Sequence, residues 1–189
     1  MWRNGGSTLY IFDYFCMLNK NHLFNYATYA AFFLGFFWVF KYLLVILGKD
    51  LAILGFLNNL LSIGTPLILF YFLVRYNSGF LENKMSFWHG VQFSIVLFFF
   101  ASILESVVVF IHVKWIDPAF ISNLYSSLIE IAQAMELSPA LTAQLMEQPL
   151  PNSFSYVFSN VILADVFIGL LLSLFIVPLS RHIKTKQEL

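Results

Sequence analysis

The chain has 189 residues, of which 60% are hydrophobic and 11% are charged, and its formal net charge at pH 7 is zero. A soluble domain of this size cannot bury so much apolar surface, so the composition excludes an ordinary soluble fold. The balanced charge offers no basic stripe for phosphates, and we expect no nucleic-acid partner. Cys16 is the only cysteine, which excludes an internal disulfide.

Residues 1–23 form an N-terminal segment, and residues 24–189 form one membrane domain that contains every long apolar stretch. Within the N-terminal segment, the apolar run from Thr8 to Leu18 is interrupted by Asp13 and is too short to span a membrane. Two interpretations of this segment stay open. It either lies at the membrane interface, or the start was assigned too early and the true start is Met17.

Four apolar stretches of about 24 residues each predict four transmembrane helices, because a helix of that length crosses a hydrocarbon core of ~30 Å. We therefore predict an all-α polytopic membrane protein, built as a bundle of four transmembrane helices. A short helical extramembrane segment is expected between the third and fourth spans. The predicted spans cover residues 24–47, 51–74, 87–111 and 154–178.

Basic residues are distributed unequally between the two sides that these spans define. Most of them fall in the N-terminus, in the second loop (predicted from Arg75 to Met85) and in the C-terminal tail. The positive-inside rule therefore places both termini in the cytoplasm. The first group comprises Arg3, Lys20, Arg75, Lys84, Arg181, Lys184 and Lys186, and the other loops carry Lys49 and Lys114.

The segment 117–153 is expected on the outer side, and its first half carries apolar residues at helical spacing. Ser138 followed by Pro139 predicts the start of a second, shorter helix. The apolar face of the first helix could cover the mouth of the bundle or dock a membrane or periplasmic partner. We name this face the outer stripe, and it consists of Phe120, Leu124, Leu128, Ile131 and Met135.

Five polar residues inside the predicted spans lie at a common depth, ~10–15 Å below the outer boundary by helical rise. Charged residues in a span need a partner, a polar cavity or a route to the interface. Lys41, Glu105 and Asp165 come from the first, third and fourth spans, and Asn58 and Asn59 come from the second. We name these five residues the polar layer.

Two interpretations of the polar layer stay open. In the structural one, Lys41 pairs with Glu105 or Asp165 while the asparagines form hydrogen bonds across helices. In the functional one, the layer is an outward-facing pocket for a cation, a proton or a small solute. Lys41 lies on a different side of its span from the small residues Ala27, Ala31 and Gly35, so it could instead snorkel outward.

Signals for catalysis are weak. The sequence has no Gly-x-Ser-x-Gly elbow, no His-Glu-x-x-His pair and no glycine-rich phosphate loop. His89 and His112 are expected near opposite membrane faces, so they cannot share a metal. We therefore predict a protein that is not an enzyme and that has no cofactor and no metal site.

Three short motifs carry a family resemblance: RYNSG from Arg75, SFWHG from Ser86 and WIDPAF from Trp115. In this order they resemble a family of small bacterial inner-membrane proteins catalogued as domain of unknown function 4199. The resemblance covers about residues 24–184 and implies four spans in a Gram-negative cytoplasmic membrane, with the outer segment in the periplasm. The second loop departs from the family pattern because it lacks a second glycine and arginine. The family name implies no activity.

The leading functional hypothesis from the sequence is a non-enzymatic subunit or accessory factor of an envelope assembly. It rests on the small number of spans, the weak catalytic signals and the outer stripe, which is available for docking. The alternative is a small ion-coupled or proton-coupled transporter that uses the polar layer and works as a homo-oligomer.

Overall fold

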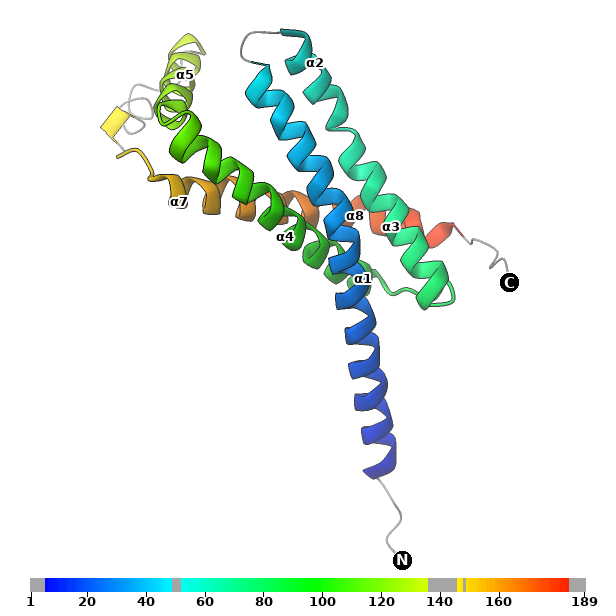
Figure 1. The fold of residues 1–189 in the computed structure, drawn as a ribbon. Coiled ribbons are helices and arrows are strands. Elements are labelled where there is room, and N and C mark those ends of the chain that lie inside the picture. The colour runs from blue at the N-terminus through cyan, green and yellow to red at the C-terminus, as the bar shows by residue number, and fades with distance from the viewer. Residues whose placement is uncertain (1–5, 49–51, 136–145, 148, 184–189) are drawn as a thin grey trace, which may run out of the picture.

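The computed structural model describes residues 6–48, 52–135, 146–147 and 149–183 (Figure 1). All regular structure in these residues is helical, which confirms the all-α prediction. Four helical spans are long and apolar enough to cross a membrane: His22–Leu47, Phe56–Phe80, Phe87–Ile116 and Ser153–His182. The helices are α1 (Gly6–Leu47), α2 (Ala52–Leu61), α3 (Gly64–Phe80), α4 (Phe87–Ile111), η1 (His112–Ile116), α5 (Phe120–Ala134), α7 (Ser153–Val157), η2 (Phe158–Leu163) and α8 (Ala164–His182).

Helix α1 is the longest element and passes without a break from the N-terminal segment into the first span. It packs mainly on α4, and α4 in turn packs on α8, while α3 lies against α8 (Figure 1). Ala27 and Ala31 on α1 are fully buried, as is expected where small side chains let helices approach closely. The interpretation of Met17 as the true start stays a prediction.

The second predicted span, residues 51–74, is confirmed as a membrane-crossing span that covers Phe56–Phe80. Within it, helices α2 and α3 are joined by a two-residue turn at Ser62 and Ile63, which the sequence did not predict. Pro66 lies in the first turn of α3, where its missing N–H needs no helical acceptor. The amide of Thr65 donates to the carbonyl of Ser62 at 3.3 Å and closes the turn.

The structure also corrects the predicted second loop. Helix α3 continues through Arg75 to Phe80, and only residues 81–86 connect it to α4. The side chain of Tyr76 explains this continuation, because it is fully buried and its ring stacks on Phe93 with centroids 4.9 Å apart. Arg75 therefore lies inside the second span and not in the loop.

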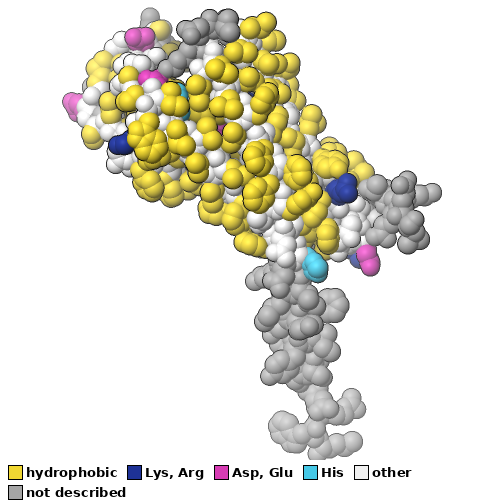
Figure 2. All heavy atoms as spheres, viewed as in Figure 1, with side chains coloured by type: hydrophobic (Ala, Val, Ile, Leu, Met, Phe, Trp, Pro, Cys, Tyr) yellow, Lys and Arg dark blue, Asp and Glu magenta, His cyan; other side chains and the backbone are white. Residues whose placement is uncertain are grey.

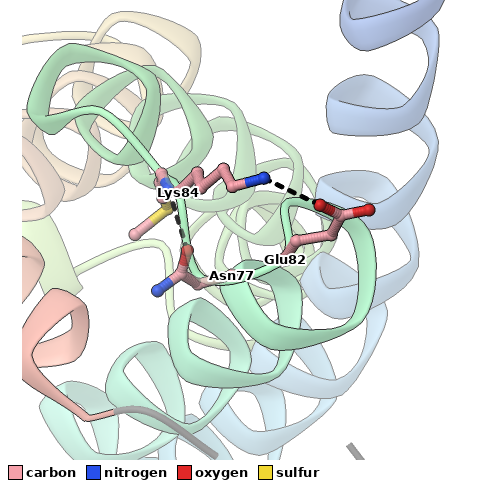
Figure 3. Close-up of polar contacts among 4 residues, drawn as sticks. Asn77, Glu82 and Lys84 are labelled. Atoms are coloured by element: carbon pink, nitrogen blue, oxygen red, sulfur yellow. Dashed lines mark hydrogen bonds and ion pairs between the residues drawn. The ribbon is translucent and has the colours of Figure 1, made fainter.

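A buried amide holds the connection between α3 and α4 (Figure 3). Asn77 is 1% exposed, and its Oδ1 accepts a hydrogen bond from the amide of Met85 at 2.9 Å. Glu82 and Lys84 form an ion pair at 2.9 Å on the exposed side of the turn (Figure 3). The hydrogen bond from Lys84 lowers the pKa of the Glu82 carboxyl, and its positive charge adds to this effect. Exposed pairs of this kind contribute little to stability, so the buried amide constrains the turn more than the ion pair does.

Beyond the third span, α5 confirms the predicted amphipathic helix. Its first turn contacts the rest of the molecule, with the Phe120 ring 5.2 Å from that of His112 and 6.2 Å from that of Tyr156. The later residues of the outer stripe, Leu128, Ile131 and Met135, are exposed. The predicted helix at Ser138 and Pro139 lies outside the described residues.

The surface of the spans is hydrophobic (Figure 2). On the face shown, apolar side chains cover the middle of the molecule, and the charged side chains lie toward its two ends. Phe36, Phe56 and Phe175, on three different helices, are 66%, 69% and 72% exposed. An apolar surface this broad exceeds the patches that soluble monomers expose and fits contact with lipid tails. The chain is therefore a multi-pass membrane protein.

Candidate intramembrane site

The structure brings the three charged residues of the polar layer to one place. Lys41 on α1, Glu105 on α4 and Asp165 on α8 line a single cavity of about 560 Å³. All four spans contribute to it, because the α2–α3 turn provides a further wall. The other lining residues are Trp38, Ser62, Ile63, Thr65, Pro66, Ile168 and Leu172.

The side-chain carboxyl groups of Glu105 and Asp165 lie next to each other in the cavity and interact directly. An ionised carboxylate can only accept hydrogen bonds, so a hydrogen bond between these two groups requires a proton on one of them. The Oδ2 atom of Asp165 is buried and accepts a hydrogen bond from no N–H or hydroxyl group of the described residues. Two carboxyl groups this close in a medium of low dielectric constant favour the sharing of one proton.

Lys41 provides the positive charge at this site. Its Nζ donates to Oγ of Ser62 at 3.4 Å, and Ser62 Oγ donates to the carbonyl of Asn58 at 3.1 Å. The Lys41 charge acts on both carboxyl groups, although it makes no direct ion pair with either in the described part of the chain. Lys41 is thus part of the charged cluster, and we name Lys41, Glu105 and Asp165 the charged triad.

The turn between α2 and α3 is fixed to α1 beside the cavity. Trp38 Nε1 donates to Oγ1 of Thr65 at 3.0 Å, and both residues are buried. The turn keeps nearly helical geometry, since the Ser62 amide donates to the carbonyl of Asn58 at 3.2 Å and Ile63 has helical backbone angles. Ser62 and Ile63 both line the cavity.

Asn58 and Asn59 do not join the charged triad, since neither lines the cavity. Asn59 is exposed, and Asn58 accepts the hydrogen bond of Ser62 through its backbone carbonyl. Oδ1 of Asn58 is buried and has no hydrogen-bond partner in the described part of the chain. The polar layer is thus divided into the charged triad and two asparagines that lie apart from it.

The family model described as "Protein of unknown function (DUF4199)" matches residues 25–177. The chain belongs to this family. The match agrees with the resemblance seen in the sequence motifs, and it includes every residue that lines the cavity of the charged triad. A search of curated proteins and a search of solved structures each found no match. The DUF4199 description names no activity.

Trp38, Ser62 and Thr65 are cavity residues of this DUF4199 protein that the sequence reasoning missed. Trp38 lies three positions before Lys41, and helical spacing places such residues on one face. Ser62 and Thr65 lie just before Pro66, which is a signal for interruption of a helix. These two signals could have identified all three residues.

A wide helical turn precedes Asp165 in the DUF4199 chain. The π-helical segment η2 ends at Leu163, and Asp165 is the second residue of α8. Such turns are rare and occur frequently at functional sites. A π turn also rotates the side chains that follow it, so the direction of Asp165 cannot be calculated from α-helical spacing alone.

The donor set of the cavity is unlike that of a transition-metal site. Among the described residues, no group of three His, Cys, Asp or Glu side chains is placed to hold a metal ion. The charged triad instead combines two carboxyl groups with one ammonium group. The absence of enzyme activity and of a cofactor stays a prediction.

Proposed function

We propose that this DUF4199 protein is a small membrane carrier that exchanges a proton for a monovalent cation in the cavity of the charged triad. The observation that carries this proposal is that the carboxyl groups of Glu105 and Asp165 meet in one intramembrane cavity, together with Lys41. Ionisable residues within a span mark ion pathways and proton relays more often than they serve packing alone.

The charges of the triad support exchange. With one shared proton, the two carboxyl groups carry one negative charge, which the ammonium group of Lys41 balances. Loss of that proton leaves one uncompensated negative charge in a medium of low dielectric constant, which is costly. A monovalent cation entering the cavity would restore neutrality. Proton release and cation binding are therefore linked through the same carboxyl pair.

Neutral oxygen atoms near the triad support cation binding. The hydroxyl groups of Ser62 and Thr65 line the cavity beside the carboxyl groups. Oδ2 of Asp165 is a buried acceptor that receives a hydrogen bond from no N–H or hydroxyl group of the described residues. Hard cations prefer carboxylate, carbonyl and hydroxyl oxygen atoms, so this set suits a small cation better than an apolar solute.

The experiment that tests this function measures proton movement in liposomes. The purified full chain is reconstituted with a pH indicator trapped inside, and a sodium or potassium gradient is then applied. In liposomes with the wild-type protein, protons are expected to move in the direction opposite to the cation that flows down its gradient. The variants Glu105→Gln and Asp165→Asn remove the shared proton and should lose this proton flux.

Glu130→Gln is the matched control, because Glu130 is an exposed carboxyl on α5, outside the spans. It should retain the wild-type flux. Equal flux from the wild type and from both triad variants would contradict the proposal, provided that all three reconstitute to the same level.

We also propose a bacterial cytoplasmic membrane location with both termini in the cytoplasm. Among the described residues, the basic residues near one end of the spans are Lys20, Arg75, Lys84 and Arg181, while Lys114 lies near the other end. This asymmetry supports the orientation through the positive-inside rule. Arg3, Lys49, Lys184 and Lys186, which contribute to the same argument from the sequence, lie outside the described residues.

A second candidate function, as a subunit of an envelope assembly, is favoured by the outer stripe. Phe120 packs against the spans and Leu124 is half-buried, but Leu128, Ile131 and Met135 remain exposed on α5. The rest of the protein covers the apolar face of this amphipathic helix only in its first turn, which leaves the remaining face available to a protein partner.

Co-purification in mild detergent tests this second candidate. A stoichiometric partner is expected with the wild type and should be lost in the double variant Leu128→Ser and Ile131→Ser. Glu130→Gln, which changes an exposed polar residue of the same helix, should keep the partner. Isolation of a homo-oligomer with no other protein attached would contradict the assembly function.

A further inference from the structure

A second cavity lies far from the charged triad, on the face shared by α1 and α3 at the end of the spans nearest residues 81–86. Its volume is about 360 Å³, and it is lined by Tyr26, Tyr29, Phe33, Tyr71, Phe72 and Arg75. We name it the tyrosine groove. We propose that the tyrosine groove binds one anionic phospholipid. The lipid phosphate would bind Arg75, and the part of an acyl chain nearest the headgroup would lie along the aromatic rings.

Arg75 is a cation within the membrane-spanning part of α3. It precedes Phe80, where the second span ends, by ~7 Å of helix. Its Nη1 donates to the hydroxyl of Tyr71 at 2.9 Å, one helical turn deeper in the span. Side chains on a helix lean toward its N-terminus, which in α3 is the direction of the membrane centre. The hydrogen bond thus holds the guanidinium group beside Tyr71, where it lines the groove.

The guanidinium group has more donors than the protein satisfies. It carries five N–H donors, and in the described part of the chain it has one hydrogen-bond acceptor, the neutral Tyr71 hydroxyl, and no carboxylate. An unpaired cation within a span is costly and calls for an anion. A phosphate accepts paired hydrogen bonds from a guanidinium group, which makes it the best complement to Arg75.

Tyr26 adds a second unsatisfied group at the same depth. It lies ~6 Å inside the start of the first span at His22, and its hydroxyl is buried without a partner among the described residues. A phenol donates hydrogen bonds readily to a phosphate oxygen. The two lining residues nearest the membrane boundary, Tyr26 and Arg75, therefore both offer unused donors.

The tyrosine groove is polar near the membrane boundary and apolar deeper in the membrane, which matches the headgroup and the acyl chains of a phospholipid. The unused donors of Tyr26 and Arg75 lie near the boundary, whereas Phe33 and Phe72 lie deeper in their spans. Phe33 is half exposed on the outer surface, so an acyl chain can reach it from the bilayer. A free phosphate ion would leave these aromatic rings uncovered, and for that reason we assign the groove to a lipid.

The test is a lipid titration of the full chain in detergent, followed by its thermal unfolding midpoint. The probes are dioleoyl phosphatidylglycerol, dioleoyl phosphatidylcholine and glycerol phosphate, which separate an anionic lipid, a zwitterionic lipid and a free headgroup. Phosphatidylglycerol alone should raise the midpoint of the wild type. In Arg75→Gln the half-saturating lipid fraction should rise on the order of tenfold, because the paired phosphate contact is lost.

Arg181→Gln is the matched control, since it removes one positive charge at the same end of the spans without changing the groove. It should keep the wild-type titration. Arg75→Lys keeps the charge but loses the paired geometry, so it should show a weaker response even if Arg75→Gln fails to fold. Equal stabilisation by phosphatidylcholine or by glycerol phosphate, or an equal loss in Arg181→Gln, would overturn the assignment to an anionic lipid.

Discussion

Lys41→Met is expected to destabilise the protein by on the order of 2–4 kcal/mol, because it removes the positive charge that balances the carboxyl pair of the cavity. Glu105 and Asp165 would then hold a negative charge in a medium of low dielectric constant, unless a second proton or an external cation neutralised it. The measurement is equilibrium unfolding in mixed detergent micelles, followed by tryptophan fluorescence.

A double-mutant cycle separates this charge effect from lost packing. In the background of Glu105→Gln and Asp165→Asn, the cost of Lys41→Met should fall to about 1 kcal/mol or less, because no carboxyl group remains to be balanced. Lys114→Met is the control on an exposed lysine near the end of the third span. A cost for Lys41→Met that stayed the same in both backgrounds would show that the charged triad is not coupled.

Gly169→Ala should cost about 1–3 kcal/mol, the usual range for overpacking a close helix contact. Gly169 lies where α8 crosses α4, and an added Cβ would meet Cγ of Phe98 at 2.4 Å and its Cβ at 2.8 Å. These atoms lie at the rigid base of the Phe98 side chain, so a rotamer change cannot relieve the clash. The helices would have to separate, which would also shift Asp165, one helical turn away on α8. The loss is measured as a lower unfolding midpoint.

Gly79→Ala provides the contrast, because a Cβ at Gly79 would meet nothing within 4 Å. Gly79 lies in the last turn of α3, where alanine is the better helix former by up to about 1 kcal/mol. This variant should therefore be neutral or slightly more stable than the wild type. If Gly169→Ala and Gly79→Ala behaved alike, the close approach of α4 and α8 would not be a determinant of the fold.

The four spans could be predicted from the sequence because length and hydrophobicity limit what a membrane helix can be. The interruption at Ser62 and Ile63 could not, because apolar residues continue through it and Pro66 is compatible with a helix start. The extension of α3 through Arg75 was also missed. It depends on burial of Tyr76 against α4, which is a tertiary contact and not a local preference.

The sequence predicted the membrane depth of the residues in the candidate site but not the directions in which their side chains point. Counting residues from the span ends placed Lys41, Glu105 and Asp165 in one layer, and the structure brings them to one cavity. The same counting added Asn58 and Asn59, which lie near the interruption and do not line the cavity. Depth follows from helical rise alone, whereas direction depends on how a helix is broken or rotated, and here the α2–α3 turn and η2 decide it.

In the proposed carrier, Glu105 and Asp165 share one proton and exchange it for a cation. The most direct test adds sodium or potassium chloride to the weakly buffered, detergent-solubilised protein and follows the pH with an indicator dye. The wild type should release about one proton per chain, because the incoming cation takes over the charge that the proton balanced. Glu105→Gln and Asp165→Asn should release none. The proposed exchange would be contradicted if the wild type released no protons, or if the wild type and both variants released equal numbers.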